Sequence, residues 1–132
     1  MVSQIPMARG LFLCDDAVVD PVTRHISLIR MFTGLGAEFF PWAARPFSVF
    51  AGLSDGFGTF TAELRITLLD EPAQTVYVVR HPIRFPDRLQ MVNYVMRITR
   101  CKFPTAGLYL FSLFLDGEWV AQQSLRVHLR EK

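Results

Sequence analysis

The fold class follows from residues 103–129, which read FPTAGLYLFSLFLDGEWVAQQSLRVHL. Two runs of strand-forming residues flank Asp116-Gly117. This dipeptide favours a type I′ turn, because both central residues of that turn need positive φ. The stretch therefore predicts a β-hairpin near the C-terminus, preceded by a turn that contains Pro104.

The turn also predicts the register of this hairpin. A two-residue loop places Leu115 opposite Glu118, Phe114 opposite Trp119, Leu113 opposite Val120 and Phe111 opposite Gln122. With strict alternation, Leu125, Val127 and Leu129 would then lie on the wrong side of the sheet. An extra residue around Ala121 to Gln123 would return them to the side of Val120, so we expect a β-bulge there.

The first strand of the hairpin is apolar on both sides. Tyr109 and Phe111 lie on one side, and Leu108, Leu110 and Phe114 lie on the other. A strand with two apolar sides is typical of the centre of a sheet. We therefore expect its second side to be covered by a loop or by another subunit.

Length and composition indicate one domain over residues 1–132. Hydrophobic residues make up 51% of the chain and charged residues 20%, so apolar surface is expected to remain for self-association. The formal net charge of +2 is too small to indicate nucleic-acid binding. No apolar run is long enough to span a bilayer, so no membrane contact is expected.

The two cysteines are expected to be buried thiols. Cys14 and Cys101 both fall within predicted strands, and a disulfide between neighbouring strands is the alternative. The N-terminus shows no secretory signal, because Asp15-Asp16 ends its short apolar run. A reducing cytoplasm is therefore the expected location.

The rest of the chain also reads as strands. Alternating or β-branched runs predict strands at residues 7–14, 24–32, 47–53, 60–69, 75–80 and 91–101. Together with the hairpin, these runs predict an all-β fold of about eight strands in two antiparallel sheets, packed face to face as a sandwich.

Three stretches interrupt this pattern. Gly34-Leu35-Gly36 is predicted to break a strand, and residues 81–88 should be irregular because of Pro82 and Pro86. Residues 37–45 are predicted to connect the two sheets, with Phe39, Phe40 and Trp42 either packed under the sheet edge or part of a contact surface. One cis bond is expected among Phe40-Pro41, Phe85-Pro86 and Phe103-Pro104, with no indication of which.

The run from Pro104 to Phe111 resembles the entry to the F strand of immunoglobulin-like domains, where Gly-x-Tyr precedes a core residue. The resemblance implies that the Tyr109 hydroxyl makes a tyrosine-corner hydrogen bond. Phe111 stands where that family has its core cysteine, so no disulfide between the sheets is implied.

The chain as a whole is similar to a family of small uncharacterised bacterial proteins. The similarity is carried by residues 11–16 (LFLCDD), the Ile26-Ser27-Leu28-Ile29 strand, and the closing Pro-x-x-Gly-x-Tyr and Leu-x-x-Asp-Gly-Glu patterns. It implies a fold but no activity.

Acidic residues gather at two predicted turns. Loop carboxylates that converge at one end of a sandwich can bind Ca²⁺, which prefers several oxygen ligands. The same residues are also favoured in ordinary turns. The weak metal candidates are Asp15, Asp16, Asp20 and Asp70.

No catalytic motif is present in the sequence. There is no Gly-x-Ser-x-Gly elbow, no phosphate-binding glycine loop and no spaced histidine pair, so neither an enzyme nor a cofactor is predicted. Arginines cluster at Arg80, Arg84 and Arg88, and again at Arg97 and Arg100, with Lys102 following. These side chains would form a modest anion-binding patch if they met in space, and otherwise a solvated edge.

These observations predict a non-catalytic, cytoplasmic module that works through protein contacts and associates with itself or with another protein. The alternative hypothesis is a small-ligand or calcium-binding module that uses the loop carboxylates. The predicted interface residues are Phe39, Phe40, Trp42, Leu108, Leu110, Phe114 and Trp119.

Overall fold

The computed structural model describes residues 6–70 and 72–131, and this part of the chain is all β, with eleven strands and no helix. The strands are β1 (Met7–Val19), β2 (Ile26–Met31), β3 (Gly34–Ala37), β4 (Trp42–Ala43), β5 (Phe47–Ser54), β6 (Gly58–Leu68), β7 (Gln74–Phe85), β8 (Val92–Ile98), β9 (Lys102–Phe103), β10 (Gly107–Leu115) and β11 (Glu118–Leu129). The all-β prediction is therefore confirmed.

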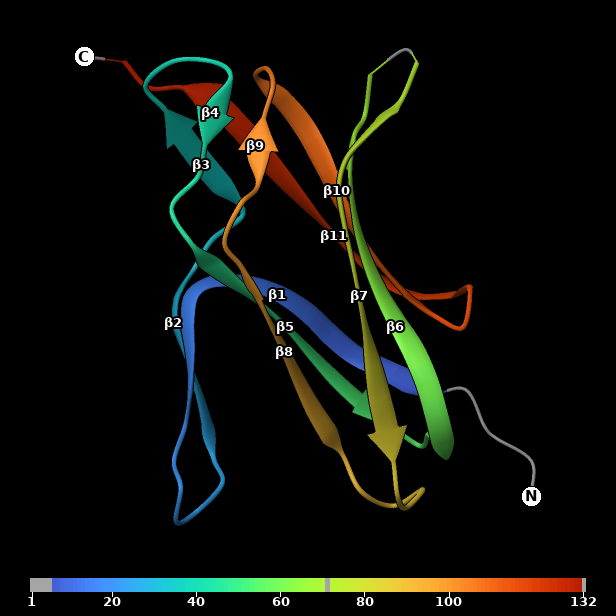
Figure 1. The fold of residues 1–132 in the computed structure, drawn as a ribbon. Helices are drawn as coiled ribbons and strands as arrows, with labels where there is room; N and C mark the ends of the chain where they lie inside the picture. The colour runs from blue at the N-terminus through green and yellow to red at the C-terminus, as the bar shows by residue number, and fades with distance from the viewer. Residues whose placement is uncertain (1–5, 71, 132) are drawn as a thin grey trace.

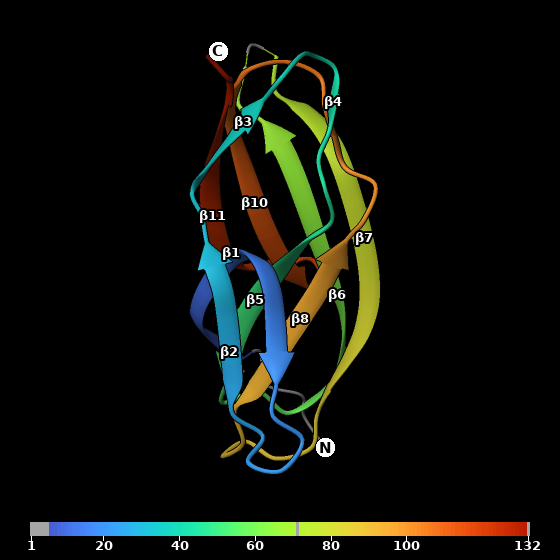
Figure 2. The ribbon, with the colours of Figure 1, turned by 90° about the vertical axis from the view of Figure 1, so that its left-hand side faces the viewer.

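The strands form two larger sheets and one small sheet (Figures 1 and 2). The strand order is β2-β1-β5-β8 in one larger sheet and β3-β11-β10-β6-β7 in the other, and β4 pairs with β9 in the small sheet. Every pair is antiparallel except β3 with β11, which is parallel.

A single hydrophobic core includes the apolar sides of both larger sheets. Leu13, Val49 and Ile98 enter it from the four-stranded sheet, and Leu64 and Leu125 enter it from the five-stranded sheet. Alternation along the strands places these side chains on one side, where burial removes them from water. Aromatic rings also cross between the sheets, and the centroids of Phe47 and Phe111 are 6.0 Å apart.

The C-terminal hairpin is confirmed. Asp116 and Gly117 have φ angles of 50° and 83°, which is the combination that a type I′ turn needs. Leu115 pairs with Glu118 and Phe114 pairs with Trp119, as predicted.

The bulge in this hairpin lies closer to the turn than predicted. The register shifts between Leu113 and Phe114, so Leu113 faces Ala121 instead of Val120, and Phe111 faces Gln123 instead of Gln122. Leu125 and Val127 are buried, as the predicted bulge requires, but Leu129 is exposed at the end of the strand. The apolar pattern required one extra residue but did not fix its position, because every site between Val120 and Leu125 restores the same alternation.

β10 lies at the centre of the five-stranded sheet, between β11 and β6, which confirms the predicted central position. The Tyr109 hydroxyl donates a hydrogen bond to the Thr105 carbonyl at 2.6 Å, which is the bond that the resemblance implied.

Several strand boundaries differ from the predictions. β1 continues through Asp15-Asp16, whose carboxylates pair with arginines. β7 continues through Pro82, which an edge strand tolerates because one of its sides has no ladder partner.

The short strands β3, β4 and β9 raise the strand number above the predicted eight. The predicted break at Gly34–Gly36 is in fact part of β3, whose glycines have little strand preference of their own and are held by pairing with β11.

One extended segment links the two larger sheets. Its first part, β2, pairs with β1, and the Phe32 amide then donates to the Leu13 carbonyl. The Thr33 carbonyl accepts from the Arg126 amide, and β3 continues beside β11. The chain between β2 and β3 therefore changes from one sheet to the other. The Phe40-Pro41 bond that follows is cis.

Candidate functional site

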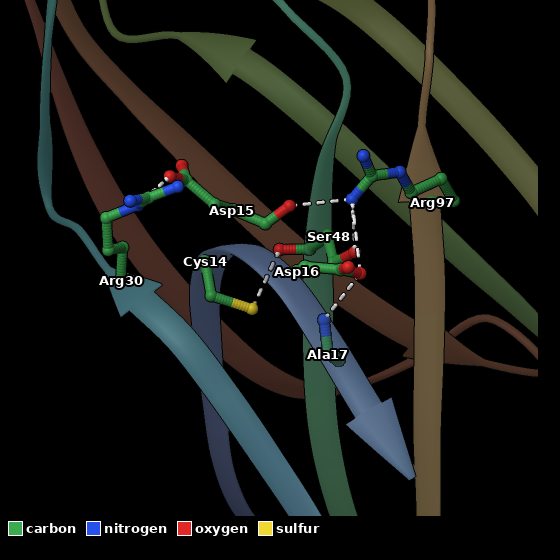
Figure 3. A network of polar contacts seen from close by, with 7 residues as sticks. All are labelled: Cys14, Asp15, Asp16, Ala17, Arg30, Ser48 and Arg97. Atoms are coloured by element: carbon green, nitrogen blue, oxygen red, sulfur yellow. Dashed lines mark hydrogen bonds and ion pairs between the residues drawn. The ribbon is translucent and has the colours of Figure 1, made fainter.

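Two of the predicted acidic residues lie in a polar network at the bend of β1 (Figure 3). Asp15 forms an ion pair of 2.6 Å with Arg30, and Asp16 lies 3.6 Å from Arg97. Arg97 also donates hydrogen bonds to the Asp15 carbonyl at 2.7 Å and to the Ser48 hydroxyl at 3.0 Å. These contacts fix the Arg97 guanidinium against β1 and β5.

The other two acidic candidates lie elsewhere. Asp20 accepts the amides of Val22 and Thr23 in the β1–β2 turn, and these bonds lower its pKa. Asp70 follows β6, and the β6–β7 turn lies at the opposite end of the molecule from the β1–β2 turn (Figure 1).

The four carboxylates of the alternative calcium-binding hypothesis therefore do not gather at one end of the structure. Turn hydrogen bonds and arginine pairing account for Asp20, Asp15 and Asp16 instead. Within the described residues, no group of three or more His, Cys, Asp or Glu side chains could hold a metal ion.

A large open groove lies beside this network. Its volume is about 1090 Å³, and it borders the bend of β1, the segment from β2 to β3, residues 38–47, and Arg97, Lys102 and Arg130. We call it the switch groove, because it follows the chain between β2 and β3, which passes from one larger sheet to the other. Its lining residues are Asp15, Asp16, Arg30, Phe32, Gly34, Leu35, Gly36, Glu38, Phe39, Pro41, Trp42, Ala43, Ala44, Arg45, Pro46, Phe47, Arg97, Lys102 and Arg130.

Three aromatic residues predicted as interface candidates lie at or beside the switch groove. Phe39 is 65% exposed, whereas Phe40 and Trp42 are half buried against the core. The Trp42 ring stacks on Phe103, with centroids 5.8 Å apart. The packed alternative therefore holds for Phe40 and Trp42, whereas Phe39 is exposed and its part in a contact surface stays a prediction.

The other predicted interface residues lie on the side of β10 and β11 that faces away from the core. Leu108, Leu110 and Phe114 are half buried there, and Trp119 is 55% exposed. We call these four residues the outer face. The Arg65 guanidinium lies 4.9 Å from the centroid of the Phe114 ring, so one end of the outer face adjoins a cation.

Glu63 holds a small charged network next to the outer face. It forms ion pairs with Arg65 and with Arg80. Burial raises the pKa of the Glu63 carboxyl, but the hydrogen bonds from the two arginines outweigh burial, and the pKa is lowered overall.

The predicted arginine patch forms only in part. Arg97 and Lys102 line the switch groove, whereas Arg80 pairs with Glu63 on the five-stranded sheet. Sequence reasoning missed Arg30, Arg45 and Arg130, because each belongs to a different stretch of chain and only the sheet topology brings them to one groove.

The two cysteines are free and buried, as predicted. Burial raises the pKa of the Cys101 thiol from 9.0 to about 12, and burial together with the carboxylates of Asp16 and Asp15 raises that of Cys14. Both thiols are therefore protonated at neutral pH, which is the unreactive form.

The fold and the switch groove together define a small all-β domain with an open groove that is lined by charged side chains. The chain belongs to a family of unknown function, DUF6941, whose family model matches residues 9–128.

Among solved structures, the chain is similar to a β-glucosidase from Listeria innocua in complex with isofagomine, with 10% identity and a TM-score of 0.46. It is also similar to the Pseudomonas fluorescens alkylpurine DNA glycosylase AlkC bound to DNA containing an abasic site analog, with 8% identity and a TM-score of 0.45. These matches cover 73% and 90% of this chain, but only 15% and 30% of the other two. No curated protein matches the chain. The described residues contain no helix that is long and apolar enough to cross a membrane.

Proposed function

We propose that the chain is a non-catalytic protein-interaction module that associates with a second copy of itself through the outer face. The observation that carries this proposal is the set of four apolar side chains on the outer face, three of which come from the central strand of the five-stranded sheet. Leu108, Leu110 and Phe114 are half buried there, and Trp119 projects beside them with 55% of its surface exposed.

A second copy suits this surface for a chemical reason. In a two-fold dimer the same patch meets itself, so apolar residues contact apolar residues on both sides. Burying apolar surface yields about 25 cal/mol per Å². The charged group of Glu63, Arg65 and Arg80 at the border would supply the polar rim that surrounds the core of most interfaces.

We infer that the two larger sheets form an immunoglobulin-like sandwich. The central position of β10, the parallel pairing of β3 with the last strand and the Tyr109 hydrogen bond all support this inference. We further infer a bacterial cytoplasmic setting, which the two unpaired thiols support because a reducing compartment keeps thiols free.

The proposal is tested by measuring the oligomeric state of Trp119→Glu by sedimentation equilibrium. A charge within the proposed interface should dissociate the dimer, because a buried unpaired carboxylate costs several kcal/mol. We expect the wild-type chain to be dimeric at micromolar concentrations and the variant to be monomeric.

The matched control is Val22→Glu, which adds the same charge at an exposed apolar residue in the β1–β2 turn, away from the outer face. This variant should remain dimeric. A wild-type chain that stays monomeric at high concentration, or equal dissociation of both variants, would refute self-association through the outer face.

A further inference from the structure

The switch groove has an unpaired strand edge along its wall. β3 is the terminal strand of the five-stranded sheet and pairs only with β11 in the described chain. Three of its residues, Gly34, Leu35 and Gly36, line the groove. Two of them are glycines, which carry no side chain of their own, although the His128 and Arg130 side chains lie close to Gly36. An extended peptide can add to such an edge as a further strand.

The charges in the groove favour an acidic occupant. Five cationic side chains face three carboxylates, which leaves a surplus of two positive charges. Each carboxylate is within 4.0 Å of a different arginine. Arg45 and Lys102 have no carboxylate partner among the described residues. They are therefore available to a carboxylate from another molecule.

Two of the existing ion pairs in the groove are also long and exposed. The Asp16–Arg97 distance is 3.6 Å and the Glu38–Arg130 distance is 3.7 Å, and all four side chains are substantially exposed. Exposed ion pairs of this kind contribute little to the stability of the fold. An incoming carboxylate can therefore share these arginines at a small cost in free energy. Arg97 is already oriented by the Asp15 carbonyl and the Ser48 hydroxyl, which reduces the entropy lost on binding (Figure 3).

The groove also has an apolar contact surface. Phe39 is 65% exposed at the groove, and Trp42 is held in place by stacking on Phe103. Rigid aromatic side chains near charged groups are typical of protein-binding surfaces.

We propose that the switch groove binds an acidic protein segment in an extended conformation. The segment pairs with the free edge of β3 and places carboxylates against Arg45 and Lys102. A partner with separated charges fits better than a continuous polyphosphate, because the three carboxylates of the groove would repel a uniformly negative chain. This site is separate from the outer face.

The test is binding of a fluorescein-labelled peptide of about ten residues that alternates Glu with Ser and Val, measured by fluorescence anisotropy. The wild-type chain should bind this peptide, and a matched peptide with Lys in place of Glu should not bind. The double variant Arg45→Glu with Lys102→Glu should bind at least about tenfold more weakly, and rising salt should weaken the wild-type complex.

The matched control for the double variant is Arg84→Glu with Arg88→Glu. These two residues are also exposed, and the change in net charge is the same, but neither residue lines the groove. The control variant and Trp119→Glu should both bind as the wild-type chain does, so this test is independent of the outer face. Circular dichroism melting curves verify that each variant is folded.

Other outcomes would overturn the proposal. Equal binding by the groove and control variants would show that total charge, and not the switch groove, holds the peptide. Tighter binding of a single-stranded oligonucleotide, with the same loss in the groove variant, would assign the groove to nucleic acid. Unchanged affinity for a peptide with alternate backbone amides methylated would refute strand pairing with β3.

Discussion

Tyr109 and Tyr94 differ in the hydrogen bonding of their buried hydroxyl groups. The Tyr109 hydroxyl bonds to the Thr105 carbonyl, whereas the buried Tyr94 hydroxyl has no hydrogen-bond partner among the described residues. The Tyr109 bond could be predicted because its partner lies four residues away, within one motif. The lack of a hydrogen-bond partner for the Tyr94 hydroxyl among the described residues could not be predicted, because it depends on packing between distant segments.

Replacing each tyrosine with phenylalanine should therefore have different effects on stability. Tyr109→Phe removes the hydroxyl that donates to the Thr105 carbonyl in this part-buried hydrogen bond and should lower the free energy of unfolding by about 1 kcal/mol. Tyr94→Phe removes an unsatisfied polar group and should leave stability unchanged or raise it. Urea titration followed by tryptophan fluorescence measures both changes. Equal destabilisation by the two substitutions would contradict this account of the Tyr109 bond.

The β10–β11 hairpin shows how far a local pattern can predict an element. The turn residues and the first two cross-strand pairs were predicted correctly, because turn chemistry is local. The position of the bulge was not predicted correctly, because an extra residue at any of several sites restores the apolar alternation equally well. The short strand β3 was missed because its glycines are strand residues only through their pairing with β11.

Asp116 stabilises this turn in two ways. It occupies a positive φ of 50°, and its carboxylate accepts the Thr61 amide at 2.7 Å. Asp116→Ala removes this acceptor, and alanine adopts the left-handed conformation less readily than aspartate. The free energy of unfolding should therefore fall by about 1–2 kcal/mol. Asp116→Asn keeps an acceptor oxygen and tolerates positive φ, so it should remain close to wild type in a chemical denaturation experiment. If the two variants lose the same stability, the turn does not depend on these features.

The molecule as a whole depends on one core shared by both larger sheets, and Cys101 lies in it with 1% of its surface exposed. Its pKa is raised to about 12 in the folded chain from an ordinary 9.0. A thiol with a raised pKa contributes stability that is fully present below pH 9.0 and is lost as the pH rises toward 12, because only the unfolded chain releases the proton readily.

The wild-type chain should therefore lose stability more steeply than Cys101→Ala between about pH 9 and about pH 12. Both proteins share the tyrosines with raised pKa values, but the Cys101 charge is one cause of the raised pKa of Tyr77 and Tyr109. The difference between the two curves therefore measures the thiol together with its effect on these two hydroxyl groups. Urea midpoints measured across this pH range provide the comparison. Parallel curves would show that the Cys101 thiol ionises as readily in the folded chain as in the unfolded chain.

The path of the chain between β2 and β3 has a consequence for biosynthesis. β3 hydrogen-bonds to β11, although about ninety residues separate them in the sequence. The ribosome synthesises β3 long before β11. The wall of the switch groove therefore cannot form until the last strand has been synthesised. Contacts between such distant segments slow folding and leave strand edges open meanwhile. A nascent chain stalled before residue 118 should therefore lack the groove, even where earlier strands have already paired.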